Sequence, residues 1–415
     1  MTSARLRRLK SRRQIWLRVH LYLGLFVGAV LAVVGFTGGI LVFYEELQDV
    51  LNAEQIRIQA PPASQRQLCP LDDIIAAAET IKPPGSRLDK LYYPRHADTA
   101  YKLLYHQPAP AHAESGEQGD GYYVFVNPYT ARATGKQLWH PRDRYWGRPL
   151  ISFIMQLHYC LLLDTPGVIF VGIVSAFAII SILTGLIVWW PLTGNFRTAL
   201  TIKPRASLVR FNFDLHKIVG VYSAAVLLVV VFSGVYFNLP EQVNVLVKQF
   251  SPLQRPNAWE GMESAKIHSR SIPGTTAITP GQAEAVARHQ YPNGQMWMLS
   301  APADGQGIYY VWKRNVRELS RYIGYREIAI DQYSGEILKR YDAGSGSAGD
   351  LFLDWQWPLH SGHAFGWPGR ILVLLSGLAC PVLYVTGVIR WLQKRRAKSA
   401  AAVIQAQKNP GKVRC

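Results

Sequence analysis

The chain has 415 residues, of which 49% are hydrophobic, and it carries a formal net charge of +18. A chain both this apolar and this basic is unlike an ordinary soluble domain and is typical of a membrane protein with basic cytoplasmic ends. The four cysteines form no CxxC or CxxCH pattern, which argues against a thiolate cluster and against covalently attached haem.

Four long apolar runs stand out along the chain, and each is close to the roughly 20 residues that a helix needs to cross a bilayer. The runs cover Leu21 to Tyr44, Val168 to Trp190, Ile218 to Phe237 and Ile371 to Trp391. The first follows a cluster of arginines but is too long for a signal peptide, so we expect a retained anchor. The sequence therefore predicts a membrane α-helical fold with four transmembrane helices.

Basic residues gather in three short segments: the N-terminus, the 191–215 loop and the tail that begins at Arg390. The positive-inside rule predicts that these three segments are cytoplasmic and that the two long segments between the helices lie outside. Topology and anionic lipid explain the basic ends better than nucleic-acid binding does.

The apolar runs and the basic segments together divide the chain into eight parts. The first half has 1–44 for the cytoplasmic N-terminus and first transmembrane helix, 45–150 for a first external module, 151–190 for a histidine segment and the second helix, and 191–215 for the basic loop. The second half has 216–239 for the third helix, 240–358 for a second external module, 359–391 for the fourth helix, and 392–415 for the basic tail.

The chain repeats itself at two constant offsets. His20 and Thr37-Gly38 of the first run match His216 and Ser233-Gly234 of the third, since 216 − 20 = 196. His158, Pro166-Gly167 and Thr184-Gly185 match His360, Pro368-Gly369 and Thr386-Gly387, since 360 − 158 = 202. Both units begin on the cytoplasmic side, so the sequence predicts two parallel, pseudo-symmetric repeats about an axis along the membrane normal.

Each long external segment has the pattern of a small α+β module. A helical stretch is predicted over 70–81 and again over 279–290, and alternating strand-like runs follow each stretch. The runs end in aromatic or apolar strands with turn residues after them, at 122–130 and 326–335, which indicates a hairpin in each module.

Four of the eleven histidines occupy repeat-equivalent places at the ends of the apolar runs. A two-fold axis would place His20 opposite His216 at one depth and His158 opposite His360 at the other. Two imidazoles that face each other across a bundle are the axial ligands of a six-coordinate haem, and they are too few for a structural zinc site. A single membrane histidine more often caps a helix or binds headgroups, but recurrence at matched depths favours two haems stacked along the membrane normal.

Other residues near these histidines are candidates for supporting roles. His363 follows His360 by three residues, which predicts the same helical face, and it could replace His360 as a ligand or line the external entrance. Arg18, Lys217 and Arg370 could pair with haem propionates, although basic residues at membrane interfaces are commonly lipid anchors. Small residues in the helices could let a macrocycle approach the backbone or could serve helix packing. They are Gly24, Gly28, Gly35, Gly38, Gly39, Gly172, Gly185, Gly220 and Gly234.

Four motifs together resemble the PepSY-associated transmembrane family. They are Arg-x-His before a glycine-rich helix that ends Thr-Gly-Gly, Leu-His-Tyr-Cys-Leu-Leu-Leu-Asp-Thr-Pro-Gly at 157–167, Thr-Gly-x-x-x-Trp-Trp-Pro at 184–191, and Pro-Leu-His-Ser-Gly at 358–362. The layout is similar to that of ferric-siderophore reductases of the FoxB type. The resemblance implies a bacterial inner-membrane protein with two haem b groups, held by His20, His158, His216 and His360, and with PepSY-like external modules. It makes a ligand role for His363 less expected.

The resemblance also implies a reaction. Electrons would move outward to reduce Fe(III) in a siderophore of the hydroxamate type, and Fe(II) would be released because it binds hard oxygen ligands less tightly. The sequence shows no nucleotide-binding motif, so the electron donor is expected to be separate: a flavoprotein, free reduced flavin or a membrane quinol. We expect the substrate in a cleft between the two external modules. Several residues could form its floor, although an interfacial aromatic belt is the commoner role for each: Trp139, His140, Arg144, Tyr145, Trp146, Trp355 and Trp357.

Two other functions are compatible with parts of the sequence. A non-redox PepSY protein that binds or inhibits an extracytoplasmic protease would explain the external modules but not the matched histidines. A transporter of iron or siderophore is disfavoured because the apolar runs contain no acidic residues and no sign of broken helices.

Overall fold

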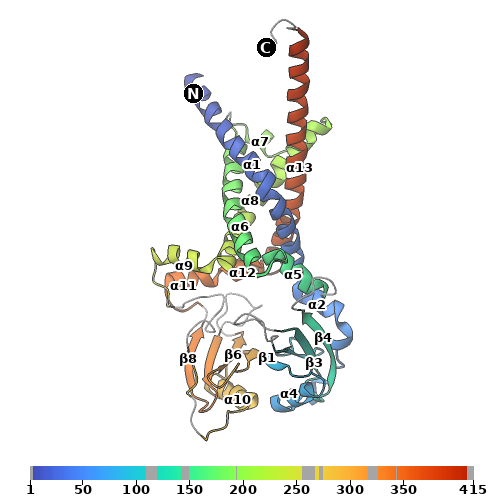
Figure 1. Cartoon of the computed structure of the whole chain (residues 1–415), viewed down its shortest axis with the longest axis vertical. Helices are drawn as coiled ribbons and strands as arrows, with labels where there is room; N and C mark the ends of the chain where they lie inside the picture. Colours follow the sequence, from blue (N-terminus) through green and yellow to red (C-terminus); the bar gives the residue numbers. More distant parts are fainter. Residues whose placement is uncertain are drawn as a thin grey trace.

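The computed structural model describes residues 3–108, 119–141, 149–192, 194–254, 267–270, 274–315, 326–342 and 344–408, with side chains described between residues 11 and 402. A helical bundle forms one end of the molecule and a β-sheet with its own helices forms the other (Figure 1). Both chain termini lie at the end of the bundle that is remote from the sheet. We call the end of the bundle that carries the termini the basic end, and the end next to the sheet the sheet end.

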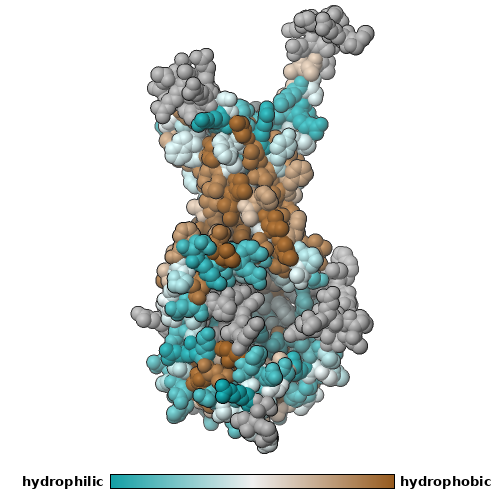
Figure 2. All heavy atoms as spheres, turned by 60° about the vertical axis from the view of Figure 1, so that its left-hand side comes forward, coloured by the Kyte–Doolittle hydropathy of each residue, from teal (hydrophilic) through white to brown (hydrophobic). Residues whose placement is uncertain are grey.

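Four long helices make the bundle: α1 (Ser3–Leu41), α6 (Asp164–Trp189), α8 (Leu208–Asn238) and α13 (Gly366–Lys408). Their apolar stretches are long enough to cross a membrane, as predicted. In Figure 2 these stretches form a hydrophobic waist between two polar ends. The helices extend beyond the predicted runs because the flanking basic residues continue the helical backbone. Each of α1 and α8 packs against both α6 and α13.

Three glycines bring α1 and α13 into backbone contact. A Cβ added to Gly377 would lie 2.5 Å from the carbonyl oxygen of Gly35 and 2.9 Å from the Cα of Gly39. A Cβ on Gly35 would in turn meet the buried Cys380 Sγ at 2.5 Å. Small residues at such a crossing let two membrane helices approach closely. Packing is therefore the role of Gly35 and Gly39 among the glycines that the sequence singled out.

Short helices surround the sheet end of the bundle. They are α2 (Tyr44–Leu51), α3 (Ala53–Ile56), α5 (Leu150–Cys160), α9 (Pro240–Lys248), α11 (Ala348–Asp354), α12 (Gln356–His360) and the 3₁₀ turn η3 (His363–Phe365). One further short helix, α7 (Phe196–Ala199), lies at the basic end, and a 3₁₀ turn η1 (Ala63–Gln65) precedes the sheet.

The two Pro-Gly landmarks mark places where the chain folds back on itself. After α5, Leu161 and Leu162 adopt left-handed conformations, with φ of 53° and 63°, and the chain reverses into α6. A Cβ on Gly167 would then lie 1.9 Å from the Cys160 carbonyl oxygen, so only glycine fits. Gly369 makes the matching approach, at 2.2 Å from the Gly362 carbonyl oxygen. Each histidine before a landmark therefore sits on a short helix of its own, α5 or α12.

Eight antiparallel strands form one sheet in the order β4-β3-β2-β1-β5-β6-β7-β8. The strands are β1 (Arg87–Tyr92), β2 (Tyr101–His106), β3 (Gly121–Val126), β4 (Ala133–His140), β5 (Gln295–Ser300), β6 (Ile308–Arg314), β7 (Arg326–Asp331) and β8 (Ile337–Asp342). The helices and hairpins expected in the two external segments are present, with α4 (Leu71–Glu79) and α10 (Pro280–Gln290) as the helices.

The two external modules join in one sheet, and this pairing leaves no cleft between β1 and β5. Strands β1 and β5 pair edge to edge, with Leu91 opposite Leu299, and this pairing joins two four-stranded meanders into one sheet. An unpaired strand edge exposes backbone donors and acceptors, and mutual pairing satisfies both edges. Asp72 of α4 strengthens the joint, because its carboxylate accepts hydrogen bonds from Thr279 Oγ1 at 2.7 Å and from the Gly281 N–H at 2.9 Å.

The two faces of the sheet differ. Helices α4 and α10 cover one face, where Ile74, Leu103, Val311 and Ile328 are fully buried in a shared apolar core. The opposite face carries two aromatic clusters, one around Tyr123 and Phe125 and the other around Tyr310 and Trp312.

The α1–α13 crossing gives a test of the bundle. We expect Gly377→Ala to lower the stability of the protein by about 1–3 kcal/mol, because its methyl group would enter the backbone of α1. Gly24→Ala is the matched control, because nothing lies within 4 Å of the Cβ position there. Thermal unfolding followed by size-exclusion chromatography in detergent measures both variants. Equal midpoints would contradict the crossing.

Candidate functional site

Two pairs of histidines meet inside the bundle. The ring centroids of His20 (α1) and His216 (α8) are 6.3 Å apart, and those of His158 (α5) and His360 (α12) are 6.0 Å apart. The structure thus brings together the two pairs that the repeat predicts. His158 contacts Gly38, which lies 38 − 20 = 18 residues after His20, or about 27 Å along α1 at ~1.5 Å per residue.

The sheet-end pair is held by matching groups on α1 and α8. His158 Nδ1 lies 2.8 Å from the Val34 carbonyl oxygen and 3.4 Å from Thr37 Oγ1. His360 Nδ1 lies 3.0 Å from the Val230 carbonyl oxygen and 2.8 Å from Ser233 Oγ. Because a carbonyl oxygen only accepts, Nδ1 of each ring is the donor.

The basic-end pair is held by α6 and α13 in the same way. His20 Nδ1 lies 2.9 Å from the Ser181 carbonyl oxygen and 3.5 Å from Thr184 Oγ1. His216 Nδ1 lies 2.9 Å from Thr386 Oγ1, whose own hydrogen is donated to the Val382 carbonyl oxygen at 2.6 Å. The Thr386 hydroxyl therefore accepts from His216, and Nδ1 is again the donor.

A glycine follows each of the four hydroxyl residues and makes room for the ring. A Cβ on Gly38 would lie 2.6 Å from His158 Cε1, and one on Gly185 would lie 2.9 Å from His20 Cε1. A Cβ on Gly387 would lie 3.4 Å from His216 Cε1, and one on Gly234 would lie 3.7 Å from His360 Cε1, which are ordinary contacts. We call each Thr-Gly or Ser-Gly pair a histidine cradle. Its hydroxyl lies within 3.5 Å of the ring nitrogen Nδ1, and its glycine presents no side chain to the ring.

The cradles determine which chemistry is open to the histidines. With Nδ1 donating a proton, the neutral ring keeps the lone pair of its other nitrogen, Nε2, for a metal. Hydrogen bonds of this kind orient a ligating histidine and raise its basicity. Within the described residues there is no group of three or more His, Cys, Asp or Glu side chains that could hold a metal ion. Each depth therefore offers a pair of nitrogen ligands.

A comparison with known families bears on this geometry. The model of the PepSY-associated TM region matches residues 17–394, which include all four histidines and their cradles. The chain belongs to the PepSY-associated transmembrane family. This confirms the family resemblance seen in the sequence and makes the chain a membrane protein of the PepSY-associated class. No curated protein matches the chain.

The family motifs acquire physical meaning in the structure. Thr37-Gly38 and Thr184-Gly185 are the cradles of His158 and His20, while Pro166-Gly167 permits the reversal between α5 and α6. Sequence reasoning recorded these dipeptides as repeat landmarks and missed their role. The recurrence of a hydroxyl residue before glycine was the available signal. The sequence alone did not show which helix faces which histidine.

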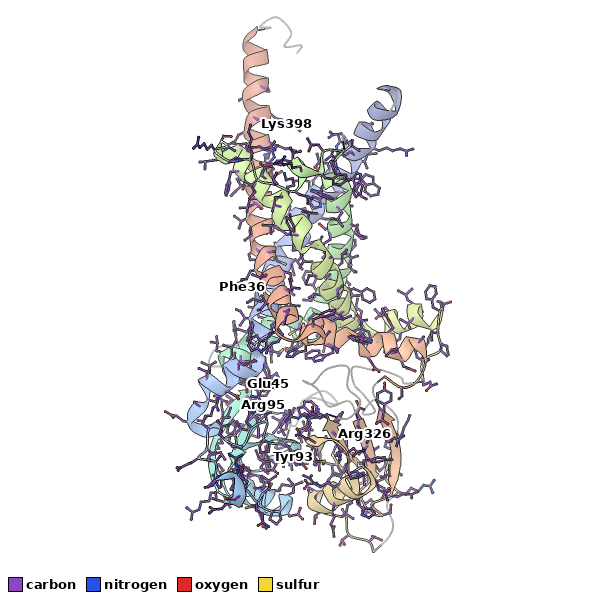
Figure 3. All side chains as sticks on the ribbon, turned by 180° about the vertical axis from the view of Figure 1, so that it is seen from behind. Phe36, Glu45, Tyr93, Arg95, Arg326 and Lys398 are labelled. Carbon is purple, nitrogen blue, oxygen red and sulfur yellow. The ribbon has the colours of Figure 1, made fainter. Side chains whose placement is uncertain are left out.

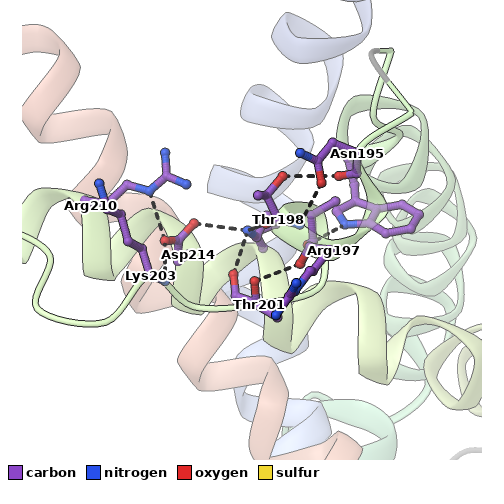
Figure 4. A network of polar contacts seen from close by, with 10 residues as sticks. Asn195, Arg197, Thr198, Thr201, Lys203, Arg210 and Asp214 are labelled. Carbon is purple, nitrogen blue, oxygen red and sulfur yellow. Dashed lines mark hydrogen bonds and ion pairs between the residues drawn. The ribbon is translucent and has the colours of Figure 1, made fainter.

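A polar network around Thr198, Thr201 and Asp214 lies at the basic end (Figure 4), and Lys217 bonds to all three residues. Its Nζ donates to the carbonyl oxygens of Thr198 and Thr201, at 2.8 and 3.1 Å, and to Asp214 at 3.1 Å. The fully buried Asp214 carboxylate also accepts from Arg210 Nε at 2.9 Å. These contacts use the three N–H groups of the lysine and tie the 195–205 segment to α8. Pairing of Lys217 with a propionate stays a prediction and would require this network to open. Arg18 lies exposed on α1.

Arg370 joins the start of α13 to the end of α1. Its guanidinium stacks between the rings of Phe43 and Trp367, at 4.6 and 4.7 Å. Its Nη2 donates to the Val42 carbonyl oxygen at 2.9 Å and to Glu46 at 2.8 Å, and its Nη1 lies 2.6 Å from Glu46. The pairing of Arg370 with a propionate also stays a prediction.

His363 does not share a helical face with His360, so that expectation is wrong. Gly362 has a φ of 77°, which ends α12, and His363 begins the separate turn η3. The left-handed glycine interrupts the helical spacing on which the expectation relied.

The aromatic residues expected on the floor of a cleft pack into the protein instead. Trp139 contacts the rings of Tyr123 and Tyr44, with centroids 5.0 and 6.1 Å away. Trp357 contacts Phe237 at 5.8 Å, and Phe237 contacts His360 at 5.2 Å. His140 Nδ1 hydrogen-bonds Gln156 Nε2 at 2.6 Å, and Trp355 precedes α12 as its N-cap residue. Arg144, Tyr145 and Trp146 lie outside the described residues.

A cavity of about 40 Å³ lies between α2 and the sheet. Its walls include Gln48, Arg95, Lys102 and Trp297, and this volume is enough for about one water molecule. The Lys102 ammonium lies over the rings of Tyr92 and Tyr123, at 4.9 and 4.8 Å, and burial lowers its pKa. The cavity is too small to hold a metal chelate.

The Arg370–Glu46 pair gives a prediction about pH. Burial by itself raises the pKa of Glu46, but the hydrogen bond and charge of Arg370 outweigh it, and the pKa lies below its ordinary value of 4.5. A depressed carboxyl pKa stabilises the fold above pH 4.5, and this contribution is lost as the pH falls through the lowered value. Because the Glu46 side chain is 47% exposed, screening limits the contribution to about 1 kcal/mol or less.

We therefore expect Glu46→Gln to lower the unfolding midpoint modestly at pH 7 and to reduce the loss of stability on acidification below pH 4.5. The exposed Glu54 of α3 provides the matched control, Glu54→Gln. Thermal melts between pH 3 and pH 7 measure both effects. An unchanged acid limb in Glu46→Gln would contradict a folding role for the pair.

Proposed function

We propose that this protein is a di-haem inner-membrane oxidoreductase that carries electrons outward across the membrane and reduces Fe(III) held by a siderophore in the periplasm. The observation that carries the proposal is the spacing of the two histidine pairs. Two imidazoles that bind one metal from opposite sides, each through a bond of about 2.0 Å, have ring centroids about 6 Å apart. The observed separations are 6.3 and 6.0 Å.

The donor set favours haem over a protein-bound metal ion. Each depth supplies two nitrogen ligands from the described residues, whereas a structural zinc ion takes four. A porphyrin brings four further nitrogen atoms, which makes two histidines sufficient. Haem b bound at each depth would supply one-electron chemistry between Fe(III) and Fe(II). His20 and His216 would hold it at the basic end, and His158 and His360 would hold it at the sheet end.

The cradles contribute the protein's own part of the redox chemistry. Each hydrogen bond that Nδ1 donates fixes the tautomer and the rotation of a ring before any ligand binds. The two depths are separated by about 27 Å along α1, close to the roughly 30 Å thickness of the hydrocarbon core. Two sites at this spacing lie toward opposite sides of the hydrocarbon core, so a transfer between them covers most of the crossing.

The direction of electron flow follows from the two ends of the molecule. Basic residues at the bundle end remote from the sheet, such as Arg197 of α7 and Arg210 in the first turn of α8, support a cytoplasmic position for that end. A separate cytoplasmic or membrane donor would reduce the inner site. The matching order of elements around the bundle supports an origin by parallel duplication, with a PepSY-like module in each unit.

The substrate follows from the chemistry that an outward electron can perform. Fe(III) in a hydroxamate siderophore is held by hard oxygen ligands, and one electron converts it to Fe(II), which those ligands bind far less tightly. The reduced protein loses that electron, and no proton-abstracting residue is required. A non-redox role in which the sheet binds a protease would leave the four cradles unexplained.

Haem content tests the proposal directly. We expect two haem b per chain in the purified protein, measured as the pyridine haemochrome, with bis-histidine low-spin spectra. His20→Ala and His158→Ala should each remove one haem, while His363→Ala should retain both. Reduced protein should reoxidise when a ferric hydroxamate siderophore is added and remain reduced with the iron-free siderophore. A colourless, folded protein would overturn the proposal.

The cradles can be tested at two repeat-equivalent glycines. Gly38→Ala should displace the His158 ring, since its Cβ would lie 2.6 Å from Cε1, and should lower haem occupancy or shift the spectrum of the sheet-end site. Gly234→Ala is the matched control, because its Cβ would make an ordinary contact of 3.7 Å with His360. Low-temperature absorbance and redox titration resolve the two sites. Indistinguishable variants would contradict the role of the glycine.

A further inference from the structure

A rigid arm extends sideways from the base of the bundle (Figure 1). The arm consists of α9, the 249–254 segment and α11, and α9 lies on the side nearer the spanning helices. Gly349 N–H donates to Ser251 Oγ at 2.9 Å, and Gln254 N–H donates to Asp350 at 3.1 Å. These bonds fix α9 and α11 against each other.

The inner side of the arm is an apolar cluster with the end of α8. Val243 and Leu353 are buried against Tyr236, and Val247 packs on the same cluster. The arm is also tied to the sheet, because Tyr341 of β8 donates to Asp354 at 2.6 Å. Its position relative to both the bundle and the sheet is therefore fixed.

The outer side of the arm carries exposed apolar side chains together with the polar Gln242 and Gln249. Val245 and Leu246 are 59% and 63% exposed, and Phe250 is 91% exposed. Leu351 and Phe352 of α11 are 38% and 43% exposed. Grouped apolar side chains of this kind mark contact with a partner or a membrane.

Helix α2 is the element of the first repeat unit that matches α9, and it contacts the sheet. At the offset of 196, Leu246 corresponds to Val50 of α2, and Val245 corresponds to Asp49. Asp49 and Glu45 both bind Arg95 beside the sheet, at 2.7 and 2.9 Å (Figure 3). Helix α2 is thus turned toward the sheet by its carboxylates. Helix α9 has an apolar residue in place of Asp49.

We propose that the arm lies in the headgroup and acyl boundary of the membrane leaflet at the sheet end, with Val245, Leu246 and Phe250 inserted among phospholipid chains. The arm is continuous with the apolar belt of the bundle, because α8 ends at Asn238 and α9 begins at Pro240. Glu241 and Lys248 supply polar groups near its two ends. A short helix with an apolar face at this depth binds lipid by burying that face.

The arm gives the sheet a second connection to the membrane. Its bond between Tyr341 and Asp354 joins β8 to an element that rests on lipid, whereas the first meander is joined to the bundle through α2 and Arg95. The lipid contact therefore lies on the side of the second meander. It sets the tilt of the sheet over the bilayer.

Nitroxide accessibility tests the proposal. Leu246→Cys and Phe250→Cys would be introduced into the full chain with Cys69→Ser and Cys415→Ser, labelled, and reconstituted into phosphatidylcholine nanodiscs. The buried Cys160 and Cys380 are retained. Power saturation should show high oxygen and low nickel-chelate accessibility at both positions. Val50→Cys, the repeat-equivalent control on α2, should show the opposite ratio, although Val50 is equally open to solvent in the protein, at 74%.

Two results would overturn the proposal. Nickel-chelate accessibility at positions 246 and 250 as high as at position 50 would place the arm in water. Dipolar broadening at position 246 that disappears on dilution with unlabelled protein would place a second copy of the chain on this face. A labelled protein that retains its size-exclusion profile ensures that either result reports on folded molecules.

Discussion

The hydrogen bond from a histidine Nδ1 to the adjacent helix is the interaction on which the site depends. It requires a carbonyl or hydroxyl acceptor at the level of the ring and, at Gly38 and Gly185, a glycine where the ring crosses the helix. A hydroxyl residue followed by glycine recurs four times, at Thr37-Gly38, Thr184-Gly185, Ser233-Gly234 and Thr386-Gly387. The helices must approach closely to satisfy them, so the arrangement of the bundle and the presentation of the histidines are determined together.

The acceptors are unusual because a helix normally keeps its own carbonyl oxygens. Val34, Ser181 and Val230 lie inside long helices, and their oxygens accept from an imidazole of another helix. The hydroxyls of Thr37 and Ser233 bond back to the same turns and remain buried. Water is scarce at this depth, so a second acceptor near each ring lowers the cost of placing a polar side chain there.

The sequence predicted the features that depend on local pattern and repetition. Four apolar runs gave the four spanning helices, and equal offsets paired His20 with His216 and His158 with His360. Turn residues and aromatic alternation gave the hairpins. Features set by contacts between distant segments were not predicted. The pairing of β1 with β5 joins residues more than 200 positions apart, and the left-handed Gly362 separates His363 from the helix of His360. The engagement of Lys217 by Thr198 and Thr201 depends on how one loop folds over α8, which residue spacing does not encode.

The edge-to-edge joint in the sheet has a mechanical consequence. The two halves of the chain are joined in two places: by the β1–β5 pairing in the sheet and by the glycine contact between α1 and α13 in the bundle. A molecule that carries cargo by alternating access needs its halves to rock against each other, and this fastening resists such rocking. An electron needs no opening, since it moves between fixed centres. The joined halves therefore fit the proposed electron transfer better than they fit the transport of cargo.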